Sequence, residues 1–323
     1  MRVLVTGCAG FIGSNVAKRL VEHGHRVVGV DHLPPDGSTK IWNLAAVHYD
    51  DFFSPSDWLA RLGSGRTDDI DCVVHNGAIS STLGIEPDQM YQANLAYSAH
   101  LLEYCQHQRI PLVYASSASV YGRTDKGAKA FESPRSTYAL SKWLFDRKAT
   151  SLQNPSAAVV GLRYFNVYGP GEYHKGSMAS MAHQICRRFL QNDRVLLFGE
   201  SLGYGPGEHR RDFVSVKMIA DLTVHLCGWV HKNRAVHIAD VGMGRALTFN
   251  QLAKSVRDQV GFGEIGYKPM PEAVKRIYQT HTEADVSTLE QFDWDPDWSG
   301  YSLEATLPSL VADVKKMIRE TVE

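Results

Sequence analysis

Two residues of the segment "STYALSK" have the types and spacing of a proton-transfer pair. Tyr138 and Lys142 stand four residues apart, so on a helix both side chains project from one face. A phenol with a pKa of about 10 is a poor base at neutral pH, but a neighbouring ammonium group favours the phenolate. The pair is therefore a candidate for general acid–base catalysis, although an ordinary amphipathic helix can carry the same spacing by chance.

Hydroxyl groups close the strand-like segment that precedes this pair. In "PLVYASSASVYG", Ser117 and Ser119 follow an apolar run and could hydrogen-bond a substrate oxygen. A glycine turn, this serine-bearing strand end and the tyrosine–lysine pair follow one another along the chain. That order argues against a chance match.

The glycine turn is "TGCAGFIG", in which Gly7, Gly10 and Gly13 lie between a strand and a helix. Without Cβ atoms the backbone can approach a pyrophosphate, and the N-terminus of the following helix offers free N–H groups. The next apolar strand ends at Asp31, near the interval expected for a carboxylate that binds the adenosine ribose. The sequence therefore predicts a dinucleotide site.

The choice between NAD and NADP stays open at this stage. Asp31 would repel a 2′-phosphate and so favours NAD. Lys40 and His32 could instead neutralise that phosphate and accept NADP, but Lys40 is equally well explained as a solvated loop residue.

Composition limits the kinds of partner. The chain of 323 residues is long enough for one large domain or two closely joined ones, and its net charge of −1 gives no general attraction to nucleic acid or to a membrane surface. The five cysteines are an odd number without metal-ligand spacing, so we expect neither a disulfide framework nor a metal site. No signal pattern precedes the first strand, and a cytoplasmic protein with a small-molecule partner is expected.

The first half of the sequence alternates apolar, β-branched runs with helical stretches. This alternation is typical of an α/β protein with a doubly wound, Rossmann-like parallel sheet. We expect strands at 2–7, 26–31, 72–78, 111–119 and 158–169, and helices at 12–23, 89–108 and about 138–151.

The second half predicts a smaller lobe that folds over the strand ends. Residues 1–169 plus about 217–247 are expected to bind the dinucleotide, and about 170–216 plus 248–323 to bind the substrate. Further strands are expected at 194–199, 210–216 and 235–240, and helices at 177–191, 248–260 and 303–320.

The chain resembles, over nearly its whole length, the extended short-chain dehydrogenase/reductase enzymes that act on nucleotide sugars. The resemblance rests on the glycine turn, Asn94, the tyrosine–lysine pair, "HNGA" (75–78), "ASSASVYG" and "RYFNVYGP". Four further stretches are similar to the heptose 6-epimerase branch of that family: "HNGAISST", "YHKGSMAS", "RRDFVSV" and "IYQTHTEAD".

The resemblance implies a transient oxidation of a sugar carbon and return of the hydride to the opposite face of the ketone. Two faces imply two proton-transfer groups, and in the heptose branch the lysine of "HKGSM", here Lys175, is implicated as the second. Such a lysine must be desolvated or lie beside another cation. Gly176 could allow close approach and His174 could supply the cation, while binding of the diphosphate is the alternative role of Lys175.

The resemblance also implies a full set of site residues and a homo-oligomer paired through helices 89–108 and 138–151. The catalytic candidates are Ser117, Tyr138, Lys142 and Lys175. The cofactor-binding candidates are Gly7, Gly10, Phe11, Ile12, Gly13, Asp31, His32, Lys40, Asn76, Gly77, Ala78, Asn94, Tyr138, Lys142 and Val167. The substrate-binding candidates are Ser80, Ser81, Ser117, Asn166, Lys175, Ser177, Gln184, Phe198, Gly199, Arg211 and Tyr278, with Arg211 suited to grip a diphosphate bidentately.

Some positions depart from the heptose branch. Gln184 stands where those enzymes have a histidine, the loop 202–209 is longer, and "FSP" at 53–55 replaces a basic residue expected to hold a 2′-phosphate. A nucleotide-sugar 4-epimerase or a reductase of the same family is therefore the alternative enzyme. A 4,6-dehydratase is disfavoured, because Ala118–Ser119 stand where it carries Asp–Glu, and a dinucleotide-sensing regulator usually lacks the tyrosine–lysine pair.

Overall fold

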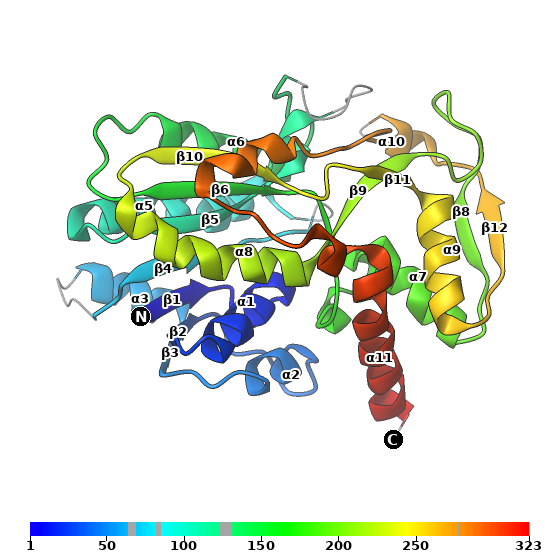
Figure 1. Cartoon of the computed structure of the whole chain (residues 1–323), viewed down its shortest axis with the longest axis horizontal. Helices are drawn as coiled ribbons and strands as arrows, with labels where there is room; N and C mark the ends of the chain where they lie inside the picture. The colour runs from blue at the N-terminus through cyan, green and yellow to red at the C-terminus, as the bar shows by residue number, and fades with distance from the viewer. Residues whose placement is uncertain (64–68, 82–84, 123–130, 277, 323) are drawn as a thin grey trace.

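A seven-stranded sheet is the largest feature of the computed structural model, which describes residues 1–63, 69–81, 85–122, 131–276 and 278–322 (Figure 1). The strand order is β10-β6-β5-β4-β1-β2-β3, and each neighbouring pair is parallel. In that order the strands are Val236–Val241, Val159–Tyr164, Leu112–Ser117, Cys72–His75, Arg2–Thr6, Arg26–Val30 and Asp51–Phe53.

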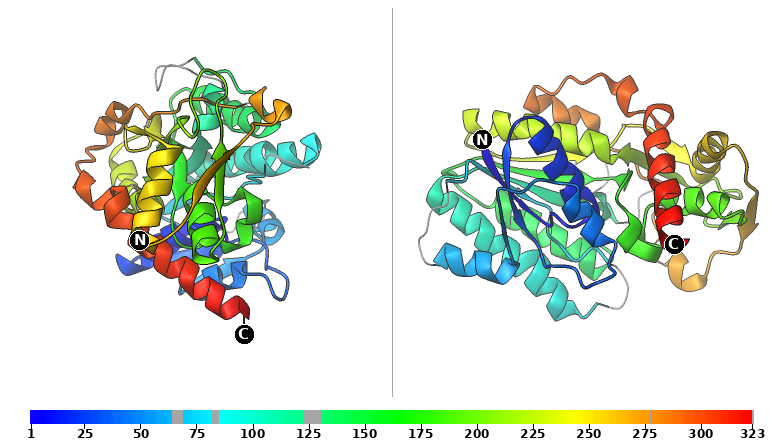
Figure 2. Two further views of the ribbon diagram at one scale, coloured as in Figure 1. Left: turned by 90° about the vertical axis from the view of Figure 1, so that its right-hand side faces the viewer. Right: turned by 90° about the horizontal axis from the view of Figure 1, so that it is seen from below.

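Helices cover both faces of this sheet (Figures 1 and 2). On one face α1 (Phe11–Glu22) and α8 (Val216–Trp229) enclose one apolar core with the strands. On the other face α3 (Pro55–Gly63), α5 (Tyr97–Gln108) and α6 (Thr137–Thr150) enclose a second core. Burial on both faces explains why the central strands read as continuous apolar runs.

The second part of the molecule is built on two small sheets. One has the order β11-β9-β7 and the other pairs β12 with β8. Three helices, α7, α9 and α11, enclose a separate apolar core with these strands. The bounds are β7 Asn166–Tyr168, β8 Val195–Phe198, β9 Arg210–Ser215, β11 Ala246–Thr248, β12 Ile265–Lys268, α7 Met181–Leu190, α9 Phe249–Val260 and α11 Leu303–Val322.

Short elements complete the described part of the chain. They are α2 (Lys40–Ala45), α4 (Pro87–Tyr91), α10 (Glu272–Lys275), the π-helical η1 (Gln92–Ala96), and the 3₁₀-helical η2 (Ala118–Tyr121), η4 (Tyr173–Met178), η5 (Val230–Lys232), η6 (Val286–Phe292) and η7 (Trp298–Tyr301). No helix among the described residues has both the length and the hydrophobicity that crossing a membrane requires.

The predicted doubly wound, Rossmann-like sheet is confirmed, and several element boundaries are corrected. The expected strand 158–169 is interrupted at Phe165, because β7 leaves the large sheet and pairs with β9. The helix expected from 177 begins only at Met181, after Ser180 caps it by accepting a hydrogen bond from the His183 N–H. Helix α8 was not predicted, although its exposed or half-buried residues Lys217, Asp221 and His225 recur at helical spacing.

Candidate active site

A cavity of about 1290 Å³ opens at the carboxyl ends of the parallel strands, where doubly wound sheets bind ligands. Thr6, Asp31, Asn76 and Ser117 mark the ends of four neighbouring strands along its wall. The sequence-predicted residues that line the cavity are Gly7, Gly10, Phe11, Ile12, Gly13, Asp31, His32, Lys40, Asn76, Gly77, Ala78, Ser80, Ser81, Ser117, Tyr138, Lys142, Asn166, Val167 and Lys175.

The glycine turn leaves no room for side chains. Gly7 has a φ of +70°, and a Cβ atom there would lie 2.7 Å from the Gly77 nitrogen. A Cβ atom on Gly13 would lie 2.1 Å from the Gly7 carbonyl oxygen. The turn therefore brings bare backbone and the N-terminus of α1, which has no side-chain cap, to the cavity wall.

Polar groups beside the turn fit a dinucleotide. The Asp31 carboxylate accepts hydrogen bonds from the Ala9 N–H at 2.9 Å and the His32 N–H at 2.8 Å, so it is held next to the glycine turn. The amide nitrogen and oxygen of Asn76 are both buried and without a protein partner. Buried polar groups in native proteins are normally satisfied, so a bound polar ligand is the natural partner of Asn76.

The predicted proton-transfer pair lies at the end of β5. Ser136 caps α6 by accepting from the Ala139 N–H, and the Lys142 Nζ donates to the Ala115 carbonyl oxygen at 2.8 Å. Burial lowers the pKa of Lys142 to about 8, although Asp146 opposes this shift. Burial raises the pKa of Tyr138, and its hydrogen bond with Ser117 acts in the opposite direction. Ser117, Tyr138 and Lys142 thus come together at one cavity wall.

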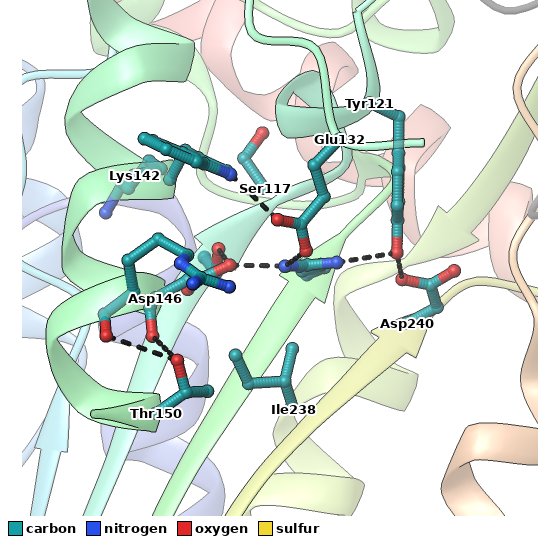
Figure 3. Close-up of polar contacts among 12 residues, drawn as sticks. Ser117, Tyr121, Glu132, Lys142, Asp146, Thr150, Ile238 and Asp240 are labelled. Atoms are coloured by element: carbon teal, nitrogen blue, oxygen red, sulfur yellow. Dashed lines mark hydrogen bonds and ion pairs between the residues drawn. The ribbon is translucent and has the colours of Figure 1, made fainter. Parts of the chain in front are cut away.

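A buried charged network lies behind this pair (Figure 3). The Arg163 Nε donates to Asp146 at 2.9 Å, and its Nη1 donates to the Tyr121 hydroxyl at 2.9 Å. Its Nη2 binds Glu132, and Tyr121 donates to Asp240 at 2.6 Å. Burial lowers the pKa of Arg163, but the Asp146 carboxylate and the other partners outweigh burial, so the pKa is raised overall.

Lys175 reaches the same cavity from η4. Its Nζ lies 5.2 Å from the centre of the Phe11 ring, at the start of α1. Burial lowers the pKa of Lys175, and the carboxylate of Glu172 opposes that shift. Lys175 and Tyr138 therefore approach one cavity from separate elements, η4 and α6.

The expectation that His174 supplies a positive charge beside Lys175 was wrong. Burial lowers the pKa of His174 to about 4, with Lys40 and Lys175 adding to the shift, so this imidazole is neutral at pH 7 and supplies no positive charge. Gly176 has a φ of +52° and no described atom within 4 Å of an added Cβ. Glycine adopts this left-handed conformation of η4 without strain, and the close approach of a substrate to Gly176 stays a prediction.

The other predicted substrate residues gather in the second part of the molecule, outside the lining of the cavity. The Arg211 guanidinium lies 4.8 Å from the centre of the Tyr278 ring and 5.6 Å from that of Phe249, and burial lowers its pKa. Phe198 contacts Tyr278 with ring centres 5.8 Å apart, and the Gly199 N–H donates to the Lys268 carbonyl. Phe249 lines the cavity and thereby connects this cluster to it.

Three further predicted residues, Asn94, Ser177 and Gln184, also lie outside the cavity lining, and they hold or adjoin its loops. The buried Asn94 accepts from the Ile79 N–H at 2.8 Å and donates to the Ile79 carbonyl at 3.0 Å. The Gln184 side chain donates to the carbonyl oxygens of Ser177 and Ala179, while Ser177 itself is exposed. Asn94 and Gln184 therefore act on the cavity through backbone that they position.

Several lining residues carried no signal in the sequence. They stand on helices or at element starts whose orientation the sequence pattern does not reveal. They include Gln89, Gln92, Tyr97, His100, Met181 and Phe249.

A glycine turn on a doubly wound sheet, joined to a serine–tyrosine–lysine group, defines a dinucleotide-dependent enzyme of the extended short-chain dehydrogenase/reductase type. The model of the NAD dependent epimerase/dehydratase family matches residues 3–242. The chain belongs to this family, and it is a nucleotide-sugar epimerase.

Individual relatives agree with this assignment. The ADP-L-glycero-D-manno-heptose-6-epimerase of Pseudomonas aeruginosa (strain UCBPP-PA14) is 38% identical over 317 residues, covering 92% of this chain and 94% of the relative. The crystal structure of the Helicobacter pylori enzyme of the same name matches with a TM-score of 0.82 and 28% identity, covering 97% of this chain and 96% of that one. The UDP-glucose 4-epimerase of Thermus thermophilus, in complex with NAD, has a TM-score of 0.76 and 25% identity, covering 98% and 99%.

Proposed function

We propose that this chain inverts C6 of an ADP-linked glycero-manno-heptose. The similarity to heptose 6-epimerases over 92% of the chain supports the sugar and the nucleotide. The structural observation that carries the proposal is that Tyr138 and Lys175, on separate elements, line one cavity. Two proton-transfer groups provide one for each face of a ketone, as inversion would use them, whereas a simple reductase uses one face and one group.

In this proposal some residues of the chain transfer protons at the sugar carbon, and others bind the diphosphate. A bound dinucleotide would accept a hydride from the sugar carbon and return it to the ketone. Tyr138 removes the proton of the sugar hydroxyl, with Lys142 favouring the phenolate and Ser117 hydrogen-bonding the phenol oxygen. Lys175 transfers the proton when the ketone presents its other face. Arg211, held between aromatic rings, grips the diphosphate.

The dinucleotide would be held by the glycine turn, Asp31 and Asn76, whose geometry and unsatisfied amide fit it. Both NAD and NADP remain compatible with this set, since Asp31 favours NAD while Lys40 and His32 also line the cavity.

Location, assembly and lobe boundaries are part of the same proposal. The five cysteines are all free and buried, which is typical of a reducing compartment and supports the prediction of a cytoplasmic enzyme.

Leu140 and Leu144 of α6 and Tyr91 of α4 are exposed apolar residues, which supports a homo-oligomer paired through these helices. The sheet topology supports a dinucleotide lobe of 1–169 plus about 217–247 and a substrate lobe of about 170–216 plus 248–323, although β7 pairs within the second.

Lys175→Met tests the two-group mechanism. If Lys175 transfers a proton, epimerisation slows strongly in both directions while substrate affinity changes little. With Tyr138 intact, the variant should still oxidise or reduce a substrate analogue on one face. A wild-type kcat with a raised KM would instead assign Lys175 to phosphate binding. NMR of the sugars recovered from a panel of nucleotide sugars, including UDP-hexoses, identifies the inverted carbon and would detect a 4-epimerase.

Tyr138→Phe tests the other group. Loss of an acid–base residue typically lowers turnover by about 10²–10⁴-fold. The variant should still bind the dinucleotide, because the glycine turn and Asp31 are unchanged, and this can be measured by cofactor fluorescence. Near-normal turnover would remove Tyr138 from the mechanism.

A further inference from the structure

Glu172 is a completely buried carboxylate at the beginning of the segment that carries Lys175. Its Oε1 accepts from the Gly169 N–H at 3.2 Å and from the Ser180 hydroxyl at 2.7 Å. Its Oε2 accepts from the Ser180 N–H at 2.5 Å. One side chain thus joins the end of β7 to the start of α7 and closes the segment 169–180 into a loop.

The backbone of Glu172 also shapes the turn that presents Lys175. The Lys175 N–H donates to the Glu172 carbonyl oxygen at 3.0 Å, which begins η4. The side chain of Ser180 binds Glu172 and also accepts from the His183 N–H, so the same hydroxyl fixes the loop and caps α7. The position of Lys175 therefore depends on two sets of contacts: the hydrogen bond to the Glu172 carbonyl oxygen, and the bonds of the Glu172 carboxylate to Ser180.

We propose that Glu172 is a positioning residue: its buried carboxylate closes the segment 169–180 and supplies the negative charge that keeps Lys175 protonated at the cavity wall. This inference rests on the proposed role of Lys175 in proton transfer.

The charges of the two residues support each other. Burial raises the pKa of Glu172 and lowers that of Lys175, and the charge of each residue opposes the shift of the other. Without the Glu172 charge, burial would act on Lys175 unopposed, and the amine would lose its proton at a lower pH.

The other groups around Lys175, on its own element η4 and on the elements packed against it, do not replace Glu172. Phe11 of α1 offers only a ring face, and His174 and His183 each have a pKa lowered to about 4 by burial, so both are neutral at pH 7. Lys40 and Arg187, which lie near these two histidines, are positive. Among the described residues, Glu172 supplies the negative charge that raises the pKa of Lys175.

Glu172→Gln tests the proposal, with Asp313→Asn as its matched control. Gln keeps the length of the side chain and one acceptor oxygen but removes the charge. Asp313 of α11 accepts from the Gly171 N–H at 2.9 Å, so it is also a carboxylate bonded to this segment, but its charge does not contribute to the pKa of Lys175. The control therefore separates loss of a loop contact from loss of the counter-charge.

The measurement is the rate at which acetic anhydride acylates Lys175 in the dinucleotide-bound protein, followed across pH by peptide mass spectrometry. Only the neutral amine reacts, so the midpoint reports the protonation of Lys175. Glu172→Gln should move the midpoint down, by up to about one pH unit, because it removes the charge that opposes the effect of burial on Lys175. Asp313→Asn should leave it in place, and the pH limb of kcat should move with the midpoint.

An unchanged midpoint in a folded Glu172→Gln protein, or an equal shift in both variants, would overturn the proposal. If Glu172→Gln does not fold, Ser180→Ala removes one donor to Glu172 and should give a smaller shift in the same direction, and no shift there would also overturn it. Acylation needs no sugar substrate. A Lys175→Met enzyme with wild-type kcat would therefore refute the proposed catalytic role without deciding this test.

Discussion

Two arginines of this enzyme are equally buried but have opposite surroundings. Arg163 and Arg211 are each 7% exposed. Arg163 forms ion pairs with the carboxylates of Asp146 and Glu132. Arg211 lies against the rings of Tyr278 and Phe249 and donates to the Arg210 carbonyl oxygen, and no ion pair with a described carboxylate is present.

The positive charge of Arg163 is neutralised by carboxylates of the protein itself, whereas that of Arg211 is available to a bound anion. Charged groups are costly to bury unless they are paired. The pKa of Arg163 is raised by its carboxylates against the effect of burial, while that of Arg211 is lowered by burial. We therefore interpret Arg163 as part of the scaffold behind Lys142, and Arg211 as a preformed site for an anion such as a diphosphate.

Arg163→Met should give the largest effect on stability. It leaves Asp146 buried beside fewer donors, and removing one partner of a buried pair typically costs about 3–5 kcal/mol. The free energy of unfolding from urea titration measures this loss. Lys148→Met is the control, because Lys148 pairs with Glu103 at 3.0 Å on the exposed surface, where a pair contributes about 0–1 kcal/mol. Equal losses in both variants would contradict the scaffold interpretation.

Arg211→Met should show the reverse pattern. Replacement of a buried cation that has no carboxylate partner by an apolar side chain of similar length is expected to leave the free energy of unfolding unchanged or to raise it. Binding of the nucleotide sugar should weaken by about 1.5–3 kcal/mol, the contribution of a charge-assisted hydrogen bond. Calorimetric titration with sugar nucleotide and with dinucleotide separates the two sites, and dinucleotide affinity should not change. A variant that unfolds readily would place Arg211 in the scaffold after all.

The contrast between these arginines also shows what the sequence could predict. Local sequence patterns were sufficient to predict the glycine turn, the strands that follow it and the tyrosine–lysine pair. Short spacings between residues determine the backbone conformation of the turn and the side of a helix or strand on which the side chains lie. The partners of Arg163 were not predictable, since Asp146, Glu132 and Tyr121 come from separate segments that meet only in the folded sheet. The same holds for the neutral state of His174, whose pKa is lowered mainly by burial in the folded chain, with the charges of Lys40 and Lys175 adding to that effect.

The roles of Asn94 and Gln184 mark a second limit. Both stand at positions where the resemblance implied ligand contacts, yet their side chains hydrogen-bond backbone groups of cavity loops. A motif identifies a residue type at a place in the chain, but the direction of its side chain is decided by tertiary packing. Helix α8 shows the opposite case, since Lys217, Asp221 and His225 mark a polar face at helical spacing and the segment was still not recognised as a helix.

Asp240 gives the smallest of the expected effects. It tests whether the positive charge of Arg163 stabilises a carboxylate with which it forms no direct ion pair. Asp240 is 2% exposed, and its hydrogen-bonded connection to Arg163 runs through the Tyr121 hydroxyl. Burial raises its pKa to about 6, against the opposing hydrogen bond from Tyr121. The folded protein therefore holds this proton at pH values where the unfolded chain, with an ordinary carboxyl pKa of about 3.9, has lost it. The resulting stability is fully present below pH ~4 and is lost as the pH rises through about 6.

Asp240→Asn removes this titration. The difference in unfolding free energy, variant minus wild type, should rise by about 1–3 kcal/mol between pH 4 and pH 7, and other carboxyls cancel in that difference. Asp50→Asn is the control of opposite sign: hydrogen bonds from Arg2 and Arg26 lower the pKa of Asp50, so its contribution is present above the ordinary carboxyl pKa and is lost as the pH falls. Urea titrations at several pH values measure both slopes. A difference that stays constant or falls from pH 4 to pH 7 in Asp240→Asn would mean that Arg163 stabilises the Asp240 carboxylate as fully as it does its direct partners.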